Sequence, residues 1–141
     1  MYILRERQRI APFVFATLDR MTAAEAGAQL VALCREGRFV DAVKTLYADD
    51  VVSVEAADYQ GLGREMRGKE AVLRKNVDWL DANEVHGASV TGPFVGSDKF
   101  AVLYSFDSTR RTSRERVQFT EIAVYTVVDG KIVHEEFLYA A

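Results

Sequence analysis

The long alternation of apolar and polar residues after Glu84 is the feature that most constrains how this 141-residue chain can fold. Such alternation predicts β-strands with one buried face, here near residues 84–95, 99–108, 116–128 and 131–139. Gly96-Ser97-Asp98 and Asp129-Gly130 are typical of hairpin turns between such strands. The C-terminal part of the chain is therefore predicted to be a run of long antiparallel strands.

The N-terminal part has helical periodicity instead, in segments 22–36, 39–47 and 68–82. In the first segment Thr22 can cap the helix, Glu25 completes a capping box, and Gly37 follows as the C-terminal cap. A strand candidate over 51–56 and a glycine-containing loop over 57–67 separate the second helix from the third. Three helices followed by four long strands is an α+β pattern, in which helices cover one face of a curved sheet.

Composition and charge exclude several classes of protein. The hydrophobic share of 49% and the charged share of 28% are typical of a globular domain and not of a disordered or fibrous chain. Cys34 is the only cysteine, so the chain has no internal disulfide and no cysteine–histidine set for structural zinc. A net charge of −3 argues against nucleic acid, and no apolar run reaches the roughly 18 residues of a membrane-spanning helix. We expect a soluble cytoplasmic protein that needs no metal or other cofactor and binds neither nucleic acid nor a membrane.

Residues 1–20 differ from the rest of the chain because they contain four arginines but only two acidic residues. They lack the long apolar core and the small-residue cleavage site of a secretory signal. Pro12 would interrupt a helix that began before it. We therefore divide the chain into an N-terminal arm or upstream extension over 1–20 and a domain over 21–141, with Met21 as an alternative start.

Four short segments occur in an order that is typical of one superfamily. They are Leu46 to Val52, Arg67 to Val72, the aromatic strand Phe119 to Val127, and Asp129 to Val133. Together with the order of helices and strands, they make the chain resemble the SnoaL-like and nuclear transport factor 2-like superfamily over roughly residues 22–139. The resemblance implies a cystatin-like α+β cone, with three helices packed on the concave face of a curved, mostly antiparallel sheet.

What the resemblance implies about function is broad, because this fold hosts unrelated activities. Members include ketosteroid isomerases, polyketide cyclases, dehydratases, epoxide hydrolases and binding proteins, and most form homodimers through the outer face of the sheet. We therefore expect a homodimer with a deep cavity that binds a small apolar molecule. The residues expected to line this cavity are Tyr47, Tyr59, Met66, Trp79, Tyr104, Phe119 and Tyr125.

Glu55 is the first candidate for acid–base chemistry. It lies five residues beyond Asp50, and the resemblance implies a general base there, because ketosteroid isomerases have an aspartate at a similar position. Burial would raise the pKa of such a group and favour proton transfer near neutral pH. The alternative follows from alternation: Val52 and Val54 share one face of the strand, so Glu55 on the other face could point into water.

The oxyanion hole of ketosteroid isomerases has no counterpart here. That site pairs a tyrosine on the first helix with a protonated aspartate on a late strand, whereas the corresponding helical stretch, residues 29–33, has no tyrosine. The late-strand position falls near Ala123, which cannot donate a hydrogen bond. Steroid isomerisation by that arrangement is therefore not expected.

Glu121 is the second candidate, because alternation places it on the same strand face as Phe119, Ala123 and Tyr125. A carboxyl group among aromatic rings would have a raised pKa and could act as a general acid or hold the polar end of a ligand. The alternatives are a structural ion pair with an arginine of the segment 110–116, or exposure at the dimer face.

His134 is the third candidate, since histidine exchanges protons near neutral pH. Adjacent strand residues point to opposite faces, so His134 shares a face with Glu136 and not with Glu135. The alternative is a partly buried, hydrogen-bonded histidine with a structural role.

Two functional hypotheses follow from these residues. In one, the protein is an enzyme that performs cofactor-independent acid–base chemistry of the isomerase, cyclase or dehydratase type, with Glu55, Glu121 and His134 as catalytic candidates. In the other, it is a non-catalytic ligand-binding or dimerisation module whose cavity is filled by aromatic side chains. The two differ in whether titratable side chains converge in an open cavity.

Overall fold

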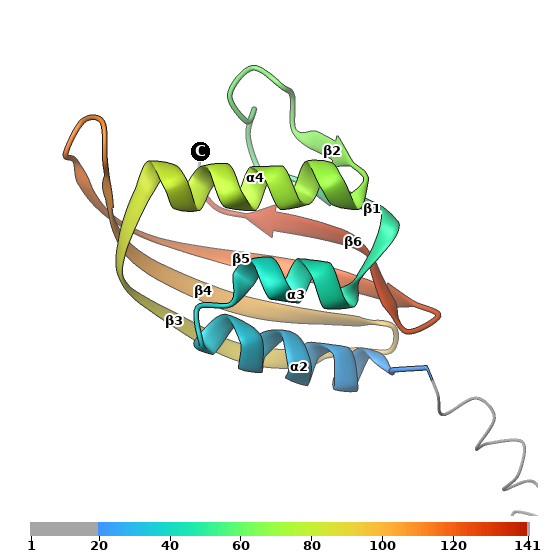
Figure 1. The fold of residues 1–141 in the computed structure, drawn as a ribbon. Coiled ribbons are helices and arrows are strands. Elements are labelled where there is room, and N and C mark those ends of the chain that lie inside the picture. The colour runs from blue at the N-terminus through green and yellow to red at the C-terminus, as the bar shows by residue number, and fades with distance from the viewer. Residues whose placement is uncertain (1–19, 141) are drawn as a thin grey trace, which may run out of the picture.

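The computed structural model describes residues 20–140, and within them three helices lie across one face of a curved six-stranded sheet (Figure 1). The helices are α2 (Ala23–Arg35), α3 (Phe39–Leu46) and α4 (Lys69–Ala82). The strands are β1 (Tyr47–Val54), β2 (Glu65–Arg67), β3 (Asn83–Val95), β4 (Lys99–Arg110), β5 (Arg116–Val128) and β6 (Lys131–Leu138). The expected N-terminal arm over residues 1–20 lies, apart from Arg20, outside the described residues.

The sheet has the strand order β2-β1-β6-β5-β4-β3. The four strands after α4 form the predicted antiparallel meander. β6 then pairs in parallel with β1, and the register sets Ser53 beside Glu135. This pairing brings together segments that are 82 residues apart in the chain. The other strand pairs are antiparallel, so the expected α+β cone with a mostly antiparallel sheet is confirmed.

The chain passes directly from α3 into β1, so the strand begins four residues earlier than the predicted strand over 51–56. The helix ends at Leu46 and the strand begins at Tyr47. Asp49 and Asp50 therefore belong to the strand. Their side chains remain hydrated because this part of β1 is exposed.

The predicted loop over 57–67 contains the short strand β2, which pairs with β1 at the edge of the sheet. The register places Met66 opposite Ser53. Three residues are too few to show an alternating pattern, so β2 could not be predicted from the sequence.

Helix α2 begins at the predicted cap and packs closely on the sheet. The Thr22 hydroxyl accepts a hydrogen bond from the backbone N–H of Glu25 at 3.2 Å. A Cβ at Gly27 would lie 2.9 Å from Cβ of Pro93 and 3.0 Å from Cγ of Phe100. Glycine is required here because any side chain would force α2 away from β3 and β4.

Packing is close under α2 and open under α4. The largest buried apolar side chains of the core include Leu30, Leu46, Phe100, Val51 and Ile132. Along α4, by contrast, Val72 and Lys75 are the buried residues. The inner side of α4 therefore faces a space and not a filled core. None of the helices described between residues 20 and 140 is long and apolar enough to cross a membrane.

Candidate functional site

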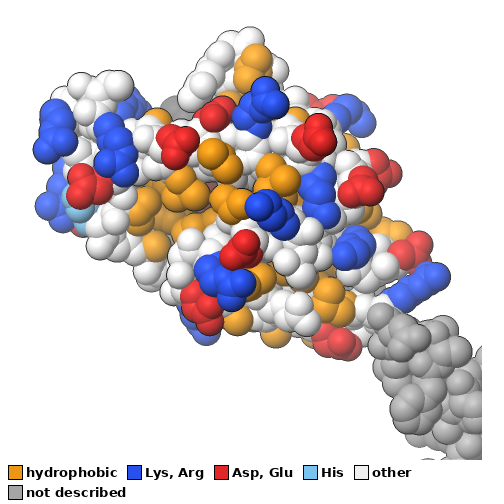
Figure 2. Space-filling model, viewed as in Figure 1, with side chains coloured by type: hydrophobic (Ala, Val, Ile, Leu, Met, Phe, Trp, Pro, Cys, Tyr) orange, Lys and Arg blue, Asp and Glu red, His pale blue; other side chains and the backbone are white. Residues whose placement is uncertain are grey.

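A cavity of about 520 Å³ lies between the helices and the concave face of the sheet. This volume is in the range of small-molecule sites, so the aromatic side chains do not fill the cone. Figure 2 shows apolar side chains recessed between α4 and the α2–α3 pair. The apolar wall includes Leu30, Phe39, Ala42, Val43, Trp79, Leu80, Phe106, Phe119 and Phe137.

Four aromatic rings form a continuous part of this wall. Trp79 of α4 lies with its ring centroid 5.5 Å from that of Phe106 and 6.1 Å from that of Phe119. Phe106 also contacts Phe39 of α3, at 5.8 Å between centroids. Flat ring faces on α3, α4, β4 and β5 therefore offer a large apolar contact area to a ligand.

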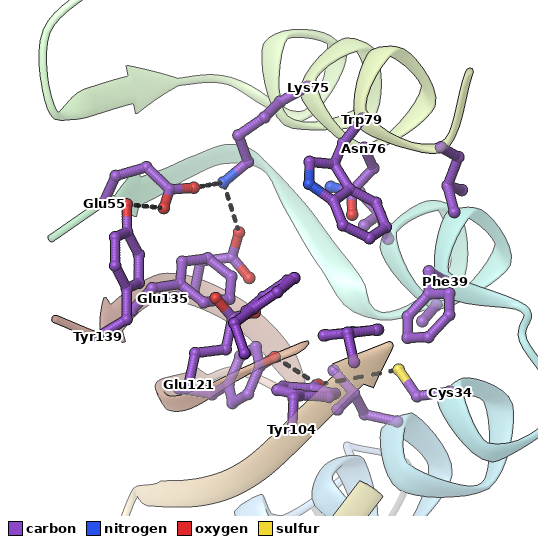
Figure 3. A pocket seen from close by; sticks show the side chains of 18 of the residues that line it. Cys34, Phe39, Glu55, Lys75, Asn76, Trp79, Tyr104, Glu121, Glu135 and Tyr139 are labelled. Atoms are coloured by element: carbon purple, nitrogen blue, oxygen red, sulfur yellow. Dashed lines mark hydrogen bonds and ion pairs between the residues drawn. The ribbon is translucent and has the colours of Figure 1, made fainter. Parts of the chain in front are cut away.

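The charged residues of the cavity gather at one end, away from Trp79 and Phe39 (Figure 3). This acidic end consists of Glu55, Lys75, Glu121, Glu135 and Tyr139. They come from the residue that follows β1, from α4, β5 and β6, and from the segment after β6. The acidic end is therefore built from segments that are distant in the sequence.

Glu55 points into the protein, so the alternative in which it faces water is excluded. On β1 and the residue after it, Val51, Ser53 and Glu55 are buried, at 0%, 0% and 8% exposure. The intervening Val52 and Val54 occupy the other face and are half-buried. The polar residues take the inner face because their hydrogen-bonding partner, Lys75, lies above them on α4.

Lys75 is the centre of a buried ion-pair network. Its Nζ donates hydrogen bonds to Glu55 Oε1 at 2.6 Å and to Ser53 Oγ at 2.8 Å, and lies 3.8 Å from Glu135 Oε1. The same nitrogen lies 4.7 Å from the centre of the Phe137 ring, a cation–π contact. A buried amine is tolerated only when charges and hydrogen bonds replace water in this way.

The network continues on both sides of Lys75. Ser53 Oγ donates to Glu135 Oε1 at 2.7 Å, and the Tyr47 hydroxyl donates to Glu135 Oε2. At the other end the Tyr139 hydroxyl donates to Glu55 Oε2 at 3.0 Å. Both carboxylates are thus held in fixed positions by donors from β1, from α4 and from the segment after β6.

The side chain of Glu121 is held differently, because its carboxyl group makes no hydrogen bond or ion pair with any other residue in the range 20–140. The pKa of Glu121 is raised from its usual 4.5 to about 7, mainly by burial and further by the negative charges of Glu55 and Glu135, while Lys75 acts in the opposite direction. A carboxyl group with this pKa is present in both protonation states near neutral pH. The arginine of the β4–β5 hairpin nearest in sequence, Arg116, instead pairs with Asp107, at 2.7 Å between Nη2 and Oδ2.

The remaining polar groups of the wall are not free acids or nucleophiles. The hydroxyls of Tyr104 and Tyr125 are hydrogen-bonded at 2.7 Å. Burial raises the pKa of the nearby Cys34 thiol to about 11, so this cysteine stays protonated, as its apolar position in the sequence indicates. The Tyr59 hydroxyl is buried and has no hydrogen-bond partner among the described residues.

The structure brings together most, but not all, of the residues predicted for the site. Glu55 and Glu121 lie at the acidic end, and the residues predicted as lining that do line the cavity are Tyr47, Tyr59, Trp79, Tyr104, Phe119 and Tyr125. Met66 does not line it, because β2 is the edge strand and Met66 is buried at that edge. His134 does not line it either. Its side chain points to the outer face of the sheet, as do those of Val52 and Thr126, which lie beside it in the register.

Sequence reasoning missed Lys75, Glu135 and Tyr139. A signal existed for Lys75, because it falls on the apolar side of its helix with Val72 and Trp79 at helical spacing. Predicting Glu135 and Tyr139 as cavity residues would have required the register of β6 against β1, and the sequence pattern does not contain this register. Within residues 20–140, no group of three histidine, cysteine, aspartate or glutamate side chains is placed to hold a metal ion.

Fold and cavity together define an α+β cone whose helices and sheet enclose an open pocket. Residues 21–139 match the family model of the SnoaL-like domain, and the chain belongs to that family. The similarity covers the α2–β6 region that forms the cavity, so the expected superfamily is confirmed.

Solved structures agree with this assignment. A protein from Mesorhizobium loti, provisionally described as a SnoaL-like polyketide cyclase with carbohydrate phosphatase as a second description, is 39% identical; the alignment covers 84% of this chain and 100% of that one, with a TM-score of 0.79. A provisionally assigned isomerase from Bacillus subtilis is 16% identical over 85% and 90% of the two chains, with a TM-score of 0.69.

A protein of ketosteroid isomerase-like fold from Catenulispora acidiphila, whose structure contains trimethylamine, is 18% identical over 84% and 88%, with a TM-score of 0.65. At these identities the B. subtilis and C. acidiphila proteins show the fold alone. A comparison with the curated proteins found no match.

Proposed function

We propose that this protein binds a small, largely apolar molecule in the cavity and transfers a proton to or from it without a cofactor, as isomerases, cyclases and dehydratases do. The observation that carries the proposal is the state of Glu121: its carboxyl group lies in an open cavity without a hydrogen-bonding partner in residues 20–140, and its pKa is about 7. General acid–base catalysis is most effective when the pKa of the group is close to the working pH.

The other carboxylates have a supporting role in this proposal. Both oxygens of Glu55 are engaged, by Lys75 and by Tyr139. Glu135 is 1% exposed and is held by Ser53. Acid–base enzymes commonly place two kinds of carboxyl group in one site, one held by hydrogen bonds and one free to exchange a proton. Glu121 transfers the proton, and Glu55 contributes to its raised pKa and to the shape of the site.

The proposal is tested by proton exchange into a simple ketone. We expect the protein to speed the exchange of the α-protons of 2-tetralone in D₂O, followed by ¹H NMR, above the rate in buffer. The E121Q variant cannot transfer a proton and should lose about a hundredfold or more of this activity. Glu115→Gln, a carboxylate change on the exposed β4–β5 hairpin, is the matched control and should leave the rate unchanged.

Exchange at the buffer rate with wild-type protein, or an equal rate with E121Q, would refute proton transfer by Glu121. In that case a binding module without catalysis is the remaining function for the same cavity.

We also propose that the protein forms a homodimer through the outer face of the sheet. Leu103, Ile122 and Leu138 are neighbours in register there, and Ile122 and Leu138 are 41% and 48% exposed. Apolar side chains grouped on one sheet face are typical of an interface.

The Ile122→Lys variant is expected to abolish this dimer, because it places a charge in the apolar group. Light scattering coupled to size exclusion should then give the mass of one chain for the variant and of two for the wild type. Ala71→Lys, on the exposed side of α4, should stay dimeric. A wild-type protein with the mass of one chain would refute the dimer.

A further inference from the structure

The charges around the cavity do not balance. Three carboxyl groups line it, those of Glu55, Glu121 and Glu135, and within the described residues Lys75 is the one basic side chain in the lining. Lys75 compensates one of the two fixed carboxylates. The site therefore carries one uncompensated negative charge when Glu121 is protonated and two when Glu121 is ionised.

Lys75 is not available to an anionic ligand. Two of its three N–H groups donate to Glu55 and Ser53, and Glu135 and the Phe137 ring lie around the remainder of the amine. An anion entering the acidic end would meet carboxylates without a free cation to pair with. Its transfer from water into this site would be costly.

A cation meets the opposite conditions. Glu121 has no partner among the described residues, and Phe119 lies two residues before it on the same strand face, in contact with Trp79. A positively charged nitrogen between a carboxylate and aromatic faces gains both an ion pair and cation–π contacts. Lys75 over Phe137 shows that an ammonium–aromatic contact already forms part of this cavity.

We propose that the ligand of the cavity carries a cationic nitrogen on an apolar body of aromatic size, with the nitrogen at Glu121 and the body against Trp79, Phe106 and Phe119. This inference rests on the proposed function, because it names the class of molecule that binds in the same cavity. With the cation bound, Glu121 is a carboxylate, the form that accepts a proton.

The charged groups that face Glu121 are Glu55 directly after β1, Lys75 of α4 and Glu135 of β6, with the Tyr139 hydroxyl beside Glu55. A bound cation favours the ionised form of Glu121, so binding releases a proton at neutral pH. The affinity for a permanent cation should therefore increase with pH up to about the pKa of Glu121, which is about 7, and be constant above it.

Three probes of one shape test the proposal: phenyltrimethylammonium, the neutral tert-butylbenzene and the anionic benzenesulfonate. Trp79 is the single tryptophan of the chain and lines the cavity, so its fluorescence reports binding directly. At pH 8 we expect the cation to bind at least about tenfold more tightly than the neutral probe, and the anion to bind most weakly.

Between pH 5.5 and 8 the affinity for the cation should rise about tenfold, while that for tert-butylbenzene should not rise. E121Q should bind the cation more weakly at pH 8 and lose the pH dependence, and Glu115→Gln should behave as wild type. Calorimetry at pH 7 in two buffers should detect the release of about half a proton per cation.

Equal or tighter binding of tert-butylbenzene or benzenesulfonate at pH 8 would overturn the inference, and so would binding of none of the three. These outcomes are separate from those of the 2-tetralone experiment. If exchange into the ketone depends on Glu121 but the cation is not preferred, the proposed function stands and the assignment of a cationic ligand is wrong.

Discussion

Replacing Lys75 by methionine is expected to lower the free energy of unfolding by about 3–5 kcal/mol, the typical cost of removing one partner of a buried ion pair. Methionine keeps most of the side-chain volume, so the loss arises from charge. Glu55 and Glu135 are 8% and 1% exposed, and without the amine they face each other in the protein interior. Urea unfolding at pH 7.5, followed by circular dichroism, measures the loss.

Arg74→Met is the matched control for this variant. Arg74 is the neighbouring residue of α4 but points into water, so its replacement should change the free energy of unfolding by less than about 0.5 kcal/mol. In the double variant K75M/E55Q one unpaired carboxylate is removed, and part of the lost stability should return. A loss of less than about 1 kcal/mol for K75M would show that the amine is not the centre of the network.

Replacing Glu121 by glutamine is expected to stabilise the protein at high pH by up to about 3 kcal/mol. The pKa of Glu121 is about 7 in the folded protein against the usual 4.5. The unfolded chain therefore releases this proton at lower pH than the folded protein does. As pH rises from 4.5 to 7 the folded state holds more protons, so wild-type stability falls by about 1.4 kcal/mol for each pH unit between the two values.

Urea unfolding of wild type and E121Q over pH 4 to 8.5 tests this sign. The two curves should nearly coincide at pH 4, diverge through the range from 4.5 to 7, and run parallel above it. Glu115→Gln should show no such divergence, because its carboxyl group lies on an exposed hairpin. A difference between E121Q and wild type that does not change with pH, or that has the opposite sign, would contradict a raised pKa.

The fold was largely predictable because its signals are local. Each signal involves residues that are close in sequence. They are the capping box at Thr22 and Glu25, the helical spacing of apolar residues up to Gly37, and the alternation in the meander. The short strand β2 escaped because three residues carry no periodicity.

The candidate site was predictable only in part, for the same reason. Alternation along one strand was enough to place Glu121 beside Phe119. The partners of Glu55 required two further facts, namely the parallel register that sets Ser53 beside Glu135 and the packing of α4 over β1. Both depend on contacts distant in sequence.

His134 illustrates how close such a prediction can come and still be wrong about placement. Its neighbour Glu135 is the cavity residue, because one step along a strand reverses the direction of the side chain. A one-residue difference therefore decides which of the two side chains lines the cavity. Glu135 points away from His134, and its hydrogen-bonding partners are Ser53 and Tyr47 of β1.

A ¹³C NMR titration of the Glu121 side-chain carboxyl tests the central claim most directly. The signal is assigned by its absence in E121Q, and its chemical shift is followed from pH 3 to 9. A midpoint near 7 is the predicted result and establishes a group that can exchange protons with a ligand at neutral pH. A midpoint near 4.5, the usual value for glutamate, would contradict the account of this cavity as an acid–base site.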